Sequence, residues 1–410
     1  MLVDTAVRKA PAPLWNTLGP AIVAGVAYLD PGNVASNMTA GAAYGYLLVW
    51  VVVAGNATAW LIQYLSAKLG IATGRSLPEN LGVRLRTRPV RYGYWVQAEL
   101  VAMATDIAEI LGGAIALHLL FDLPLLLGGV ITGVVSLLLL TVQSRRVTAF
   151  ERIIGGLVLV IAIGFCAGIL IGPPDPAAAV AGLVPRFEDS GSVLLAASIL
   201  GATVMPHAIY AHSALTRDRF GRVAPEDRPR LLTATRIDVT IALVVAGGVN
   251  VAILLIAAAS LQGVPGTHTL EGAHAALSAG LGPVIATLFA VALLASGLAS
   301  TSVGAYAGAE IMNGLLHVKV PLLLRRLVTL IPALVLLATG FDPTLALVLS
   351  QVVLSFGIPF ALIPLVVLTA RRSLMGDSAN RPLTTVVASV AALALITLNG
   401  TLLWLVATGG

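Results

Sequence analysis

The sequence predicts an all-α integral membrane protein with eleven transmembrane helices. Of its 410 residues, 58% are hydrophobic and only 10% are charged, whereas a soluble domain carries about 25% charged residues. Eleven apolar segments are long enough to cross a membrane as helices, which takes about 20 residues each. These segments lack the alternation over about ten residues that is typical of a transmembrane β-barrel.

The expected spans follow one another with short connections. Their limits are 15–42, 44–70, 92–120, 123–142, 152–173, 191–215, 236–261, 280–312, 321–341, 343–369 and 384–408. Three Asn-x-Ser/Thr triplets, at Asn37, Asn56 and Asn399, fall inside these spans. We therefore interpret them as chance matches to a glycosylation signal.

The basic residues support this count and give an orientation. If the N-terminus is cytoplasmic and the spans alternate, 23 of the 24 Lys and Arg residues lie inside, and only Arg186 lies outside. Because cytoplasmic loops retain positive charge, we expect a multi-pass protein of the cell (plasma or inner) membrane, with its C-terminus extracytoplasmic. The net charge of +5 belongs to these loops and does not indicate nucleic-acid binding.

The first span is interrupted by Asp30-Pro31-Gly32-Asn33. A carboxylate at mid-membrane depth costs about 2.5 to 3.5 kcal/mol on insertion scales. Pro31 removes a backbone donor and Gly32 loosens the chain, so we expect the helix to break there. Broken backbone at this depth is tolerated only where it is buried in protein or lines a cavity. Asp30, Asn33 and a freed carbonyl, that of Ala27, therefore form a candidate set of oxygen ligands for a cation.

The sixth span contains a second interruption, Gly201-Ala202-Thr203-Val204-Met205-Pro206-His207. Either proline alone is compatible with an ordinary kink, which membrane helices tolerate. The two interruptions hold corresponding places if residues 15–173 and 191–369 are two inverted repeats of five spans. Residues 384–408 then form an additional helix, and the whole chain is a single transmembrane transporter domain. Paired interrupted helices of this kind are typical of a transport site between two repeats.

The second interruption adds softer chemistry to the candidate site. Unwinding frees the carbonyl of Ala202, and Met205 contributes a thioether. Oxygen ligands alone suit Mg²⁺, Ca²⁺ or Na⁺, whereas a thioether favours a first-row transition metal. The ligand types therefore predict Mn²⁺ or Fe²⁺, although Met205 is also compatible with ordinary core packing.

The third span carries three carboxylates, Glu99, Asp106 and Glu109. Steps of seven and three residues place them on one face of a helix. Carboxylates inside a membrane face a polar interior and are expected to relay protons. The alternative is a static network of salt bridges between helices.

Three further residues are candidates for proton movement. His207 follows the second break directly and can exchange protons near physiological pH. Arg325 and Arg326 begin the ninth span from the cytoplasmic side, where they either pair with Glu99 or Glu109 or only anchor the helix at the membrane surface. His212 has no assigned role.

The two interruptions together carry a family resemblance. Asp30-Pro31-Gly32-Asn33 and Met205-Pro206-His207 resemble the signature pair of the Nramp family of proton-coupled divalent-metal transporters. The resemblance covers essentially the whole chain, both motifs are intact, and they match the bacterial manganese-transporter branch. Family members that carry Mg²⁺ lack the methionine.

The resemblance implies a LeuT-like fold and specific roles. It implies that Asp30, Asn33, Met205 and the carbonyls of Ala27 and Ala202 bind the metal, and that Gln351 of the tenth span joins them in some states. For protons it implies a leading role for Asp106, with Asp30 as the point of entry and with Glu109 and Arg326 on the exit path. His207 and the arginines also take part.

These observations predict a secondary transporter that imports Mn²⁺, and also Fe²⁺, into the cytoplasm with protons by alternating access. Its partners are divalent transition-metal ions, protons and the lipid bilayer. We expect no enzymatic activity, no cofactor, no nucleic acid and no obligate protein partner, and the chain has no nucleotide-binding loop of an ATP-driven pump. Three alternatives remain open: a Na⁺-coupled amino-acid symporter of the same fold, a passive metal channel, and a receptor that binds metal without transport.

Overall fold

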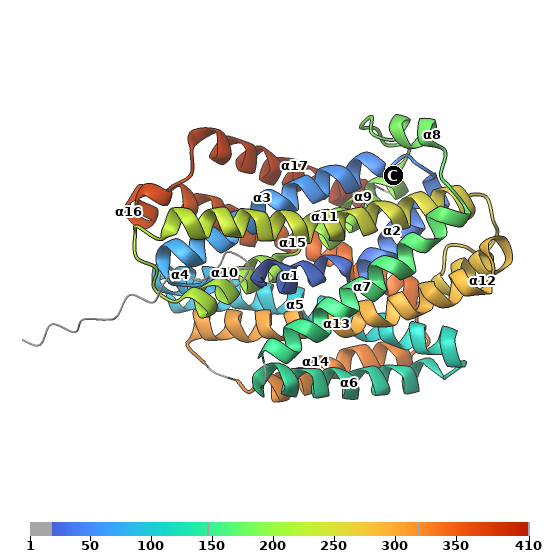
Figure 1. Ribbon diagram of the computed structural model, residues 1–410, viewed down its shortest axis with the longest axis horizontal. Helices are drawn as coiled ribbons and strands as arrows, with labels where there is room; N and C mark the ends of the chain where they lie inside the picture. The colour runs from blue at the N-terminus through green and yellow to red at the C-terminus, as the bar shows by residue number, and fades with distance from the viewer. Residues whose placement is uncertain (1–18, 146, 319, 409–410) are drawn as a thin grey trace, which may run out of the picture.

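The computed structural model describes residues 19–145, 147–318 and 320–408, and these are almost entirely helical (Figure 1). The helices in chain order are α1 (Pro20–Gly25), the 3₁₀ turn η2 (Val26–Leu29), α2 (Pro31–Tyr44), α3 (Val49–Thr73), α4 (Leu77–Arg84), α5 (Arg88–Phe121), α6 (Leu125–Arg145), α7 (Val147–Ile171), α8 (Pro176–Ala181), α9 (Ser190–Thr203), α10 (Pro206–Phe220), α11 (Arg228–Ser260), α12 (Leu270–Leu281), α13 (Pro283–Leu316), α14 (Leu322–Ala338), α15 (Pro343–Ala370), α16 (Arg372–Met375), the 3₁₀ turn η3 (Gly376–Ser378) and α17 (Pro382–Thr408).

Most predicted spans coincide with single long helices. Among the described residues, nine helices are long and apolar enough to cross a membrane, with α9 and α10 counted as one. The other two predicted spans coincide with the pair α1–α2, joined by η2, and with the 17-residue helix α14. The chain is thus an all-helical multi-pass protein, while eleven crossings and the inverted repeat stay predictions.

Part of the sequence-based orientation rests on residues outside those described. The predicted first span begins at residue 15, which precedes the described residues. Arg8, Lys9, Arg146 and Lys319, which contribute to the expected positive inner side, also lie outside them.

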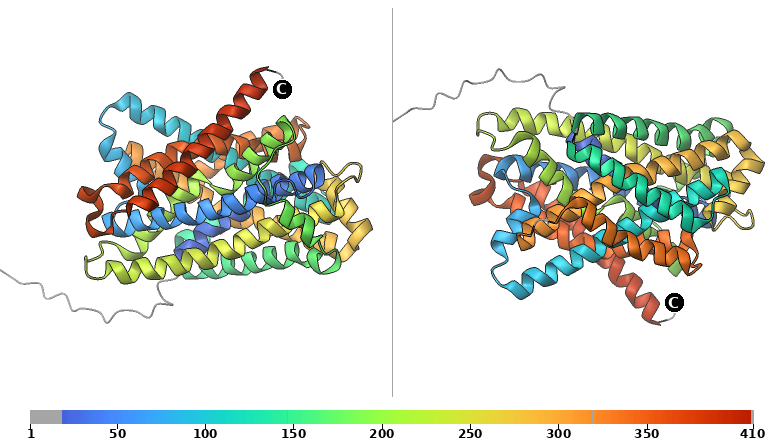
Figure 2. Two further views of the ribbon diagram at one scale, coloured as in Figure 1. Left: turned by 90° about the horizontal axis from the view of Figure 1, so that it is seen from above. Right: turned by 90° about the horizontal axis from the view of Figure 1, so that it is seen from below.

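The long helices lie roughly side by side along the longest dimension of the molecule (Figure 1). The short helices α4 and α16 lie at one end of this bundle, and α8 and α12 lie at the other. The final helix α17 runs obliquely along the outside (Figure 2), where it packs on α15 and α9. Connections that are rich in arginine and connections that are poor in it therefore lie at opposite ends.

The interrupted helices lie inside the bundle. The segments α2, α9 and α10 are mostly buried, and α15 packs against α2, α5, α9 and α10. On the other side α13 packs along α5 and against η2. The two breaks are thus enclosed by long, continuous helices.

A charged network ties three helices together at the end that holds α4. The guanidinium of Arg217 in α10 lies 2.8 Å from Glu79 in α4 and 3.0 Å from Glu310 in α13. Glu79 also completes a capping box with Ser76 at the start of α4. Burial opposes ionisation of Glu79, but the hydrogen bonds from Arg217 and Ser76 outweigh it and lower the pKa of this carboxyl.

Candidate functional site

The first break is a proline-fixed change from a 3₁₀ turn to an α-helix. Asp30 has extended backbone (φ −71°, ψ 161°), because a residue before proline is pushed out of the helical region. Pro31 occupies the first helical position of α2, where its missing N–H is not needed. The Asp30 carboxylate accepts a hydrogen bond of 2.7 Å from the backbone N–H of Asn33. The aspartate is therefore the N-cap of α2.

The second break has the same construction. The helix α9 ends at Thr203, and Met205 has extended backbone (φ −68°, ψ 119°) before Pro206 starts α10. Met205 is fully buried, as is Ala202 one turn earlier. Both proline-containing motifs thus form interrupted helices.

Asn33 joins the two breaks. Its side-chain amide donates hydrogen bonds to the carbonyl of Tyr28, at 2.5 Å, and to the carbonyl of Ala202, at 3.3 Å. Its own amide oxygen accepts a hydrogen bond of 2.8 Å from Asn37, one helical turn later. Two segments that are 169 residues apart in sequence therefore meet at one side chain.

The helix α15 closes this junction from the side. Gln351 donates from Nε2 to the second carboxylate oxygen of Asp30, at 3.3 Å. A Cβ atom at Gly32 would collide with the Gln351 side chain, and one at Gly201 would collide with the Gln351 carbonyl. Glycine at both positions therefore allows α15 to approach both breaks at once.

The Asp30 carboxylate is fully buried and has no cationic partner among the described side chains. Three amide groups around the junction donate their N–H groups inward but leave a buried side-chain oxygen without a hydrogen-bond partner: Asn37, Asn250 and Gln351. A buried acceptor without a donor is costly. The Gln351 amide binds Asp30 directly, so a carboxylate and an amide with an unpaired oxygen lie together there. Such oxygens can bind a cation.

The described residues contain no group of three or more His, Cys, Asp or Glu side chains that could hold a metal ion. An ion at the junction of the two breaks would therefore need amide, carbonyl or thioether ligands beside Asp30. The candidate ligands are all fully buried there: Ala27 in η2, Asp30, Asn33, Ala202, Met205 and Gln351.

The three acids of α5 face two arginines of α14. Arg326 is fully buried, and its Nη1 lies 2.5 Å from Asp106 and 3.3 Å from Glu109. Arg325 lies 2.7 Å from Glu99 and 3.9 Å from Asp106. Both arginines are thus interior ion-pair partners rather than anchors at the membrane surface, and three carboxylates share two guanidinium groups.

The three acids Glu99, Asp106 and Glu109 form a row on α5, which we call the acid row. The same helix contacts both breaks. Gly112, one turn beyond Glu109, packs against Pro31, since a Cβ atom there would collide with the proline ring. His207, next to the second break, lies with Nδ1 3.2 Å from the hydroxyl of Thr105, the neighbour of Asp106. The three acids that pair with the arginines of α14 therefore lie on the same helix that contacts both breaks.

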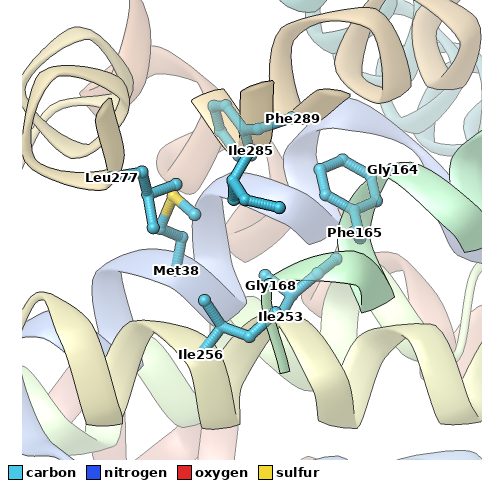
Figure 3. A pocket seen from close by; sticks show the side chains of 9 residues that line it. All are labelled: Met38, Gly164, Phe165, Gly168, Ile253, Ile256, Leu277, Ile285 and Phe289. Carbon is cyan, nitrogen blue, oxygen red and sulfur yellow. The ribbon is translucent and has the colours of Figure 1, made fainter. Parts of the chain in front are cut away.

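A separate small cavity is apolar and does not belong to this site. It lies between α2, α7, α11, α12 and α13, with Met38, Phe165 and Phe289 among its lining side chains (Figure 3). Its volume is about 10 Å³, which is barely room for one water molecule. It is too small for a hydrated ion, and none of its lining residues has a polar side chain.

Comparisons with known proteins agree with this architecture. The family described as natural resistance-associated macrophage protein-like (Nramp) matches residues 21–405. The chain belongs to the Nramp family. The divalent metal cation transporter MntH of Mycobacterium tuberculosis is 60% identical over 397 residues, which are 96% of this chain and 92% of that protein.

Solved structures give the fold. The manganese transporter of Eremococcus coleocola, crystallised with an aromatic bis-isothiourea compound, superposes with a TM-score of 0.85 at 32% identity, covering 97% of this chain and 89% of that one. A nucleobase-cation-symport-1 family transporter, at 14% identity, superposes with a TM-score of 0.63 over 94% of this chain and 89% of its own. This Nramp protein therefore has the LeuT-like fold expected from its sequence.

Several residues of the junction were missed by the sequence analysis. The sequence alone indicates a chance triplet at Asn37, although this residue follows Asn33 by four residues and so shares its helical face. Asn250, a single amide in an apolar span, donates to the carbonyl of Tyr28 at 3.1 Å. His212 bonds Gln63 at 2.6 Å, and Gln63 in turn donates to the Tyr28 hydroxyl. The sequence signal that could have identified these residues is a single polar residue within an apolar span, since such a residue needs a buried polar partner.

Replacing Arg326 by Met should strongly destabilise the protein. The change leaves Asp106 and Glu109 buried without their shared guanidinium, which costs about 3–5 kcal/mol for a broken buried ion pair. We expect a lower thermal unfolding temperature in detergent, and partial recovery when Asp106→Asn is added. Arg381→Met, at an exposed position, is the control; equal unfolding temperatures for the two single variants would contradict a structural role for this cluster.

Proposed function

We propose that this chain is a secondary active transporter that imports Mn²⁺, and also Fe²⁺ and other divalent transition metals, into the cytoplasm together with protons, by alternating access. It is a multi-pass membrane protein of a metal-transporter family and not an enzyme. The names of its relatives, a divalent metal cation transporter and a manganese transporter, support this function. The observation that carries the proposal is the buried Asp30 carboxylate, which has no cationic partner among the described side chains and is bound by Gln351, whose own amide oxygen is unpaired.

We assign the transported ion to the junction of the two breaks. Its proposed ligands are the side chains of Asp30, Asn33, Met205 and Gln351 and the carbonyls of Ala27 and Ala202. The ion would replace the amide hydrogens that now bind the Ala202 carbonyl and the Asp30 carboxylate. One charged oxygen, several neutral oxygens and one thioether favour Mn²⁺ and Fe²⁺ over Mg²⁺ and Ca²⁺.

We assign proton movement to the acid row. Asp30 is the proposed point where protons enter. The proposed path continues through Glu109, Asp106, Glu99 and His207. Arg325 and Arg326 form ion pairs with the acids along it. Three carboxylates beside two guanidinium groups leave one negative charge unbalanced. That surplus charge is what a transferred proton would neutralise.

The transport cycle uses the predicted repeats, 15–173 and 191–369, with 384–408 as an added helix. Rocking of one group of helices against the other would open the junction alternately to each side. The arginine-rich end, which holds α4 and α16, is the proposed cytoplasmic side, so the C-terminus would be extracytoplasmic.

The proposal is tested by Mn²⁺ uptake into liposomes that contain the purified protein, with excess Ca²⁺ and Mg²⁺ outside. We expect saturable uptake that Asp30→Asn reduces by about tenfold or more, the factor that corresponds to 1.4 kcal/mol of binding. Asp377→Asn, at an exposed position, should transport as the wild type does. Undiminished uptake by the Asp30→Asn variant would contradict the proposed metal site. If the wild type itself takes up no Mn²⁺, the protein would instead be a receptor or an amino-acid symporter.

Replacing Met205 by Ala tests the thioether. We expect Mn²⁺ uptake to persist while external Ca²⁺ and Mg²⁺ become stronger competitors, because the softest ligand has been removed. Competition curves for the three ions measure this directly. An unchanged order of preference would show that Met205 only packs in the core.

Replacing Asp106 by Asn tests proton coupling separately from metal binding. We expect Mn²⁺ to bind the variant with near wild-type affinity, measured by calorimetry, whereas acidification of the liposome lumen during uptake falls. The reason is that the substitution removes one proton-accepting carboxylate but leaves the proposed ligands in place. Acidification equal to that of the wild type, at equal Mn²⁺ flux, would show that Asp106 has only a structural role.

A further inference from the structure

The helices α4 and α16 lie at one end of the bundle (Figure 1). Five arginines line a polar pocket at this end. They come from four separate segments of the chain: Arg75, Arg84, Arg86, Arg222 and Arg371. The pocket has a volume of about 750 Å³ and is also lined by Thr73 and Asn80. It shares no residue with the junction of the broken helices.

Local structure positions part of this arginine cluster. Arg84 donates from Nη1 to the carbonyl and to the side-chain oxygen of Asn80, at 3.0 and 3.2 Å. The helices before the pocket, α3 and α10, are followed by the capping residues Gly74 and Gly221, whose positive φ values of 62° and 60° turn the chain sharply. The two turns lie together, because a Cβ atom on Gly74 would be 3.4 Å from Cγ of Arg222.

The positive charge of this pocket is not balanced within the described residues. None of its five arginines forms an ion pair there. Glu79, the nearby carboxylate of α4, is already bound by Arg217. Burial and the charges of Arg371 and Arg75 lower the pKa of Arg84. Like charges that face one another across a cavity attract an anion.

We infer that this pocket binds an anion that carries two or more phosphate groups. Guanidinium groups match phosphate oxygens with paired hydrogen bonds, and five of them carry more charge than one phosphate, of about −1.5 to −2, can balance. The pocket lies where the spanning helices α3 and α15 end, so the phosphates belong either to the headgroup of an anionic lipid or to a soluble compound. Basic pockets between spanning helices bind such headgroups.

A bound anion would connect the proposed transport elements. Arg222 follows α10, which starts at the second break, and Arg371 follows α15, which carries Gln351. Arg75 lies just before α4, and Arg84 is the last residue of α4. The anion would therefore brace α10 and α15 against α3 and α4 and stabilise their present arrangement.

The test compares two matched double variants of the full chain. Arg75→Gln/Arg222→Gln removes two charges from the pocket, whereas Arg88→Gln/Arg381→Gln removes two exposed charges elsewhere. One arm measures binding of cardiolipin, a lipid with two phosphates, to protein in phosphatidylcholine nanodiscs by native mass spectrometry. The other arm measures pyrophosphate binding in phosphatidylcholine nanodiscs that lack anionic lipid.

We expect Arg75→Gln/Arg222→Gln, the pocket variant, to bind about tenfold more weakly whichever probe the wild type binds, a loss of 1.4 kcal/mol. The control variant Arg88→Gln/Arg381→Gln should bind that probe as the wild type does. Binding in the cardiolipin arm alone identifies a lipid, and binding of pyrophosphate identifies a soluble ligand. Arg75→Lys/Arg222→Lys should recover part of the affinity. An unfolding temperature of the pocket variant in detergent equal to that of the control variant shows that it is folded. Because neither arm measures Mn²⁺ transport, a failure of this inference is distinguishable from a failure of the proposed transport function. No binding of either probe, or equal losses in both double variants, would overturn the inference.

Discussion

The structure depends on how the buried carboxylate of Asp30 is stabilised without a neutralising side chain. An ionised group that leaves water must be hydrogen-bonded or paired. Asp30 receives the N–H of Asn33 and the amide of Gln351, and it lies at the positive end of α2, where the helix dipole favours negative charge. The break before Pro31 is what places the carboxylate at that helix end.

The surrounding packing follows from this arrangement. The helix α15 must approach within hydrogen-bonding distance of Asp30, and only glycine at positions 32 and 201 leaves room for it. Asn37, Asn250 and Gln351 use their amide hydrogens on oxygen acceptors at the junction and leave their own amide oxygens unpaired. The result is a region with more acceptors than donors, which is unfavourable for the protein alone and favourable for a bound cation.

The cluster between α5 and α14 is stabilised differently from Asp30, because cationic side chains pair with its acids. Its carboxylates are balanced by two buried guanidinium groups, and Arg326 is further held by the hydroxyls of Ser136 and Thr301 at 3.2 and 3.1 Å. A buried ion pair gains little net stability, because desolvation offsets its attraction. Its presence beside the junction therefore fits the proton path that we propose for these acids rather than a need for stability.

The sequence by itself determined the helical class, the approximate limits of the spans, both breaks and the residue types around them. These properties are local: hydrophobic runs of sufficient length, a proline that excludes the preceding residue from the helix, and a carboxylate too costly to face lipid. Only the tertiary structure decided that Asn33 bridges the two breaks, that Asn37 and Asn250 belong to the junction, and that Arg325 and Arg326 are interior partners of α5 rather than anchors at the surface. Those contacts join residues far apart in the chain, and no local pattern specifies which distant side chain a buried polar group will meet.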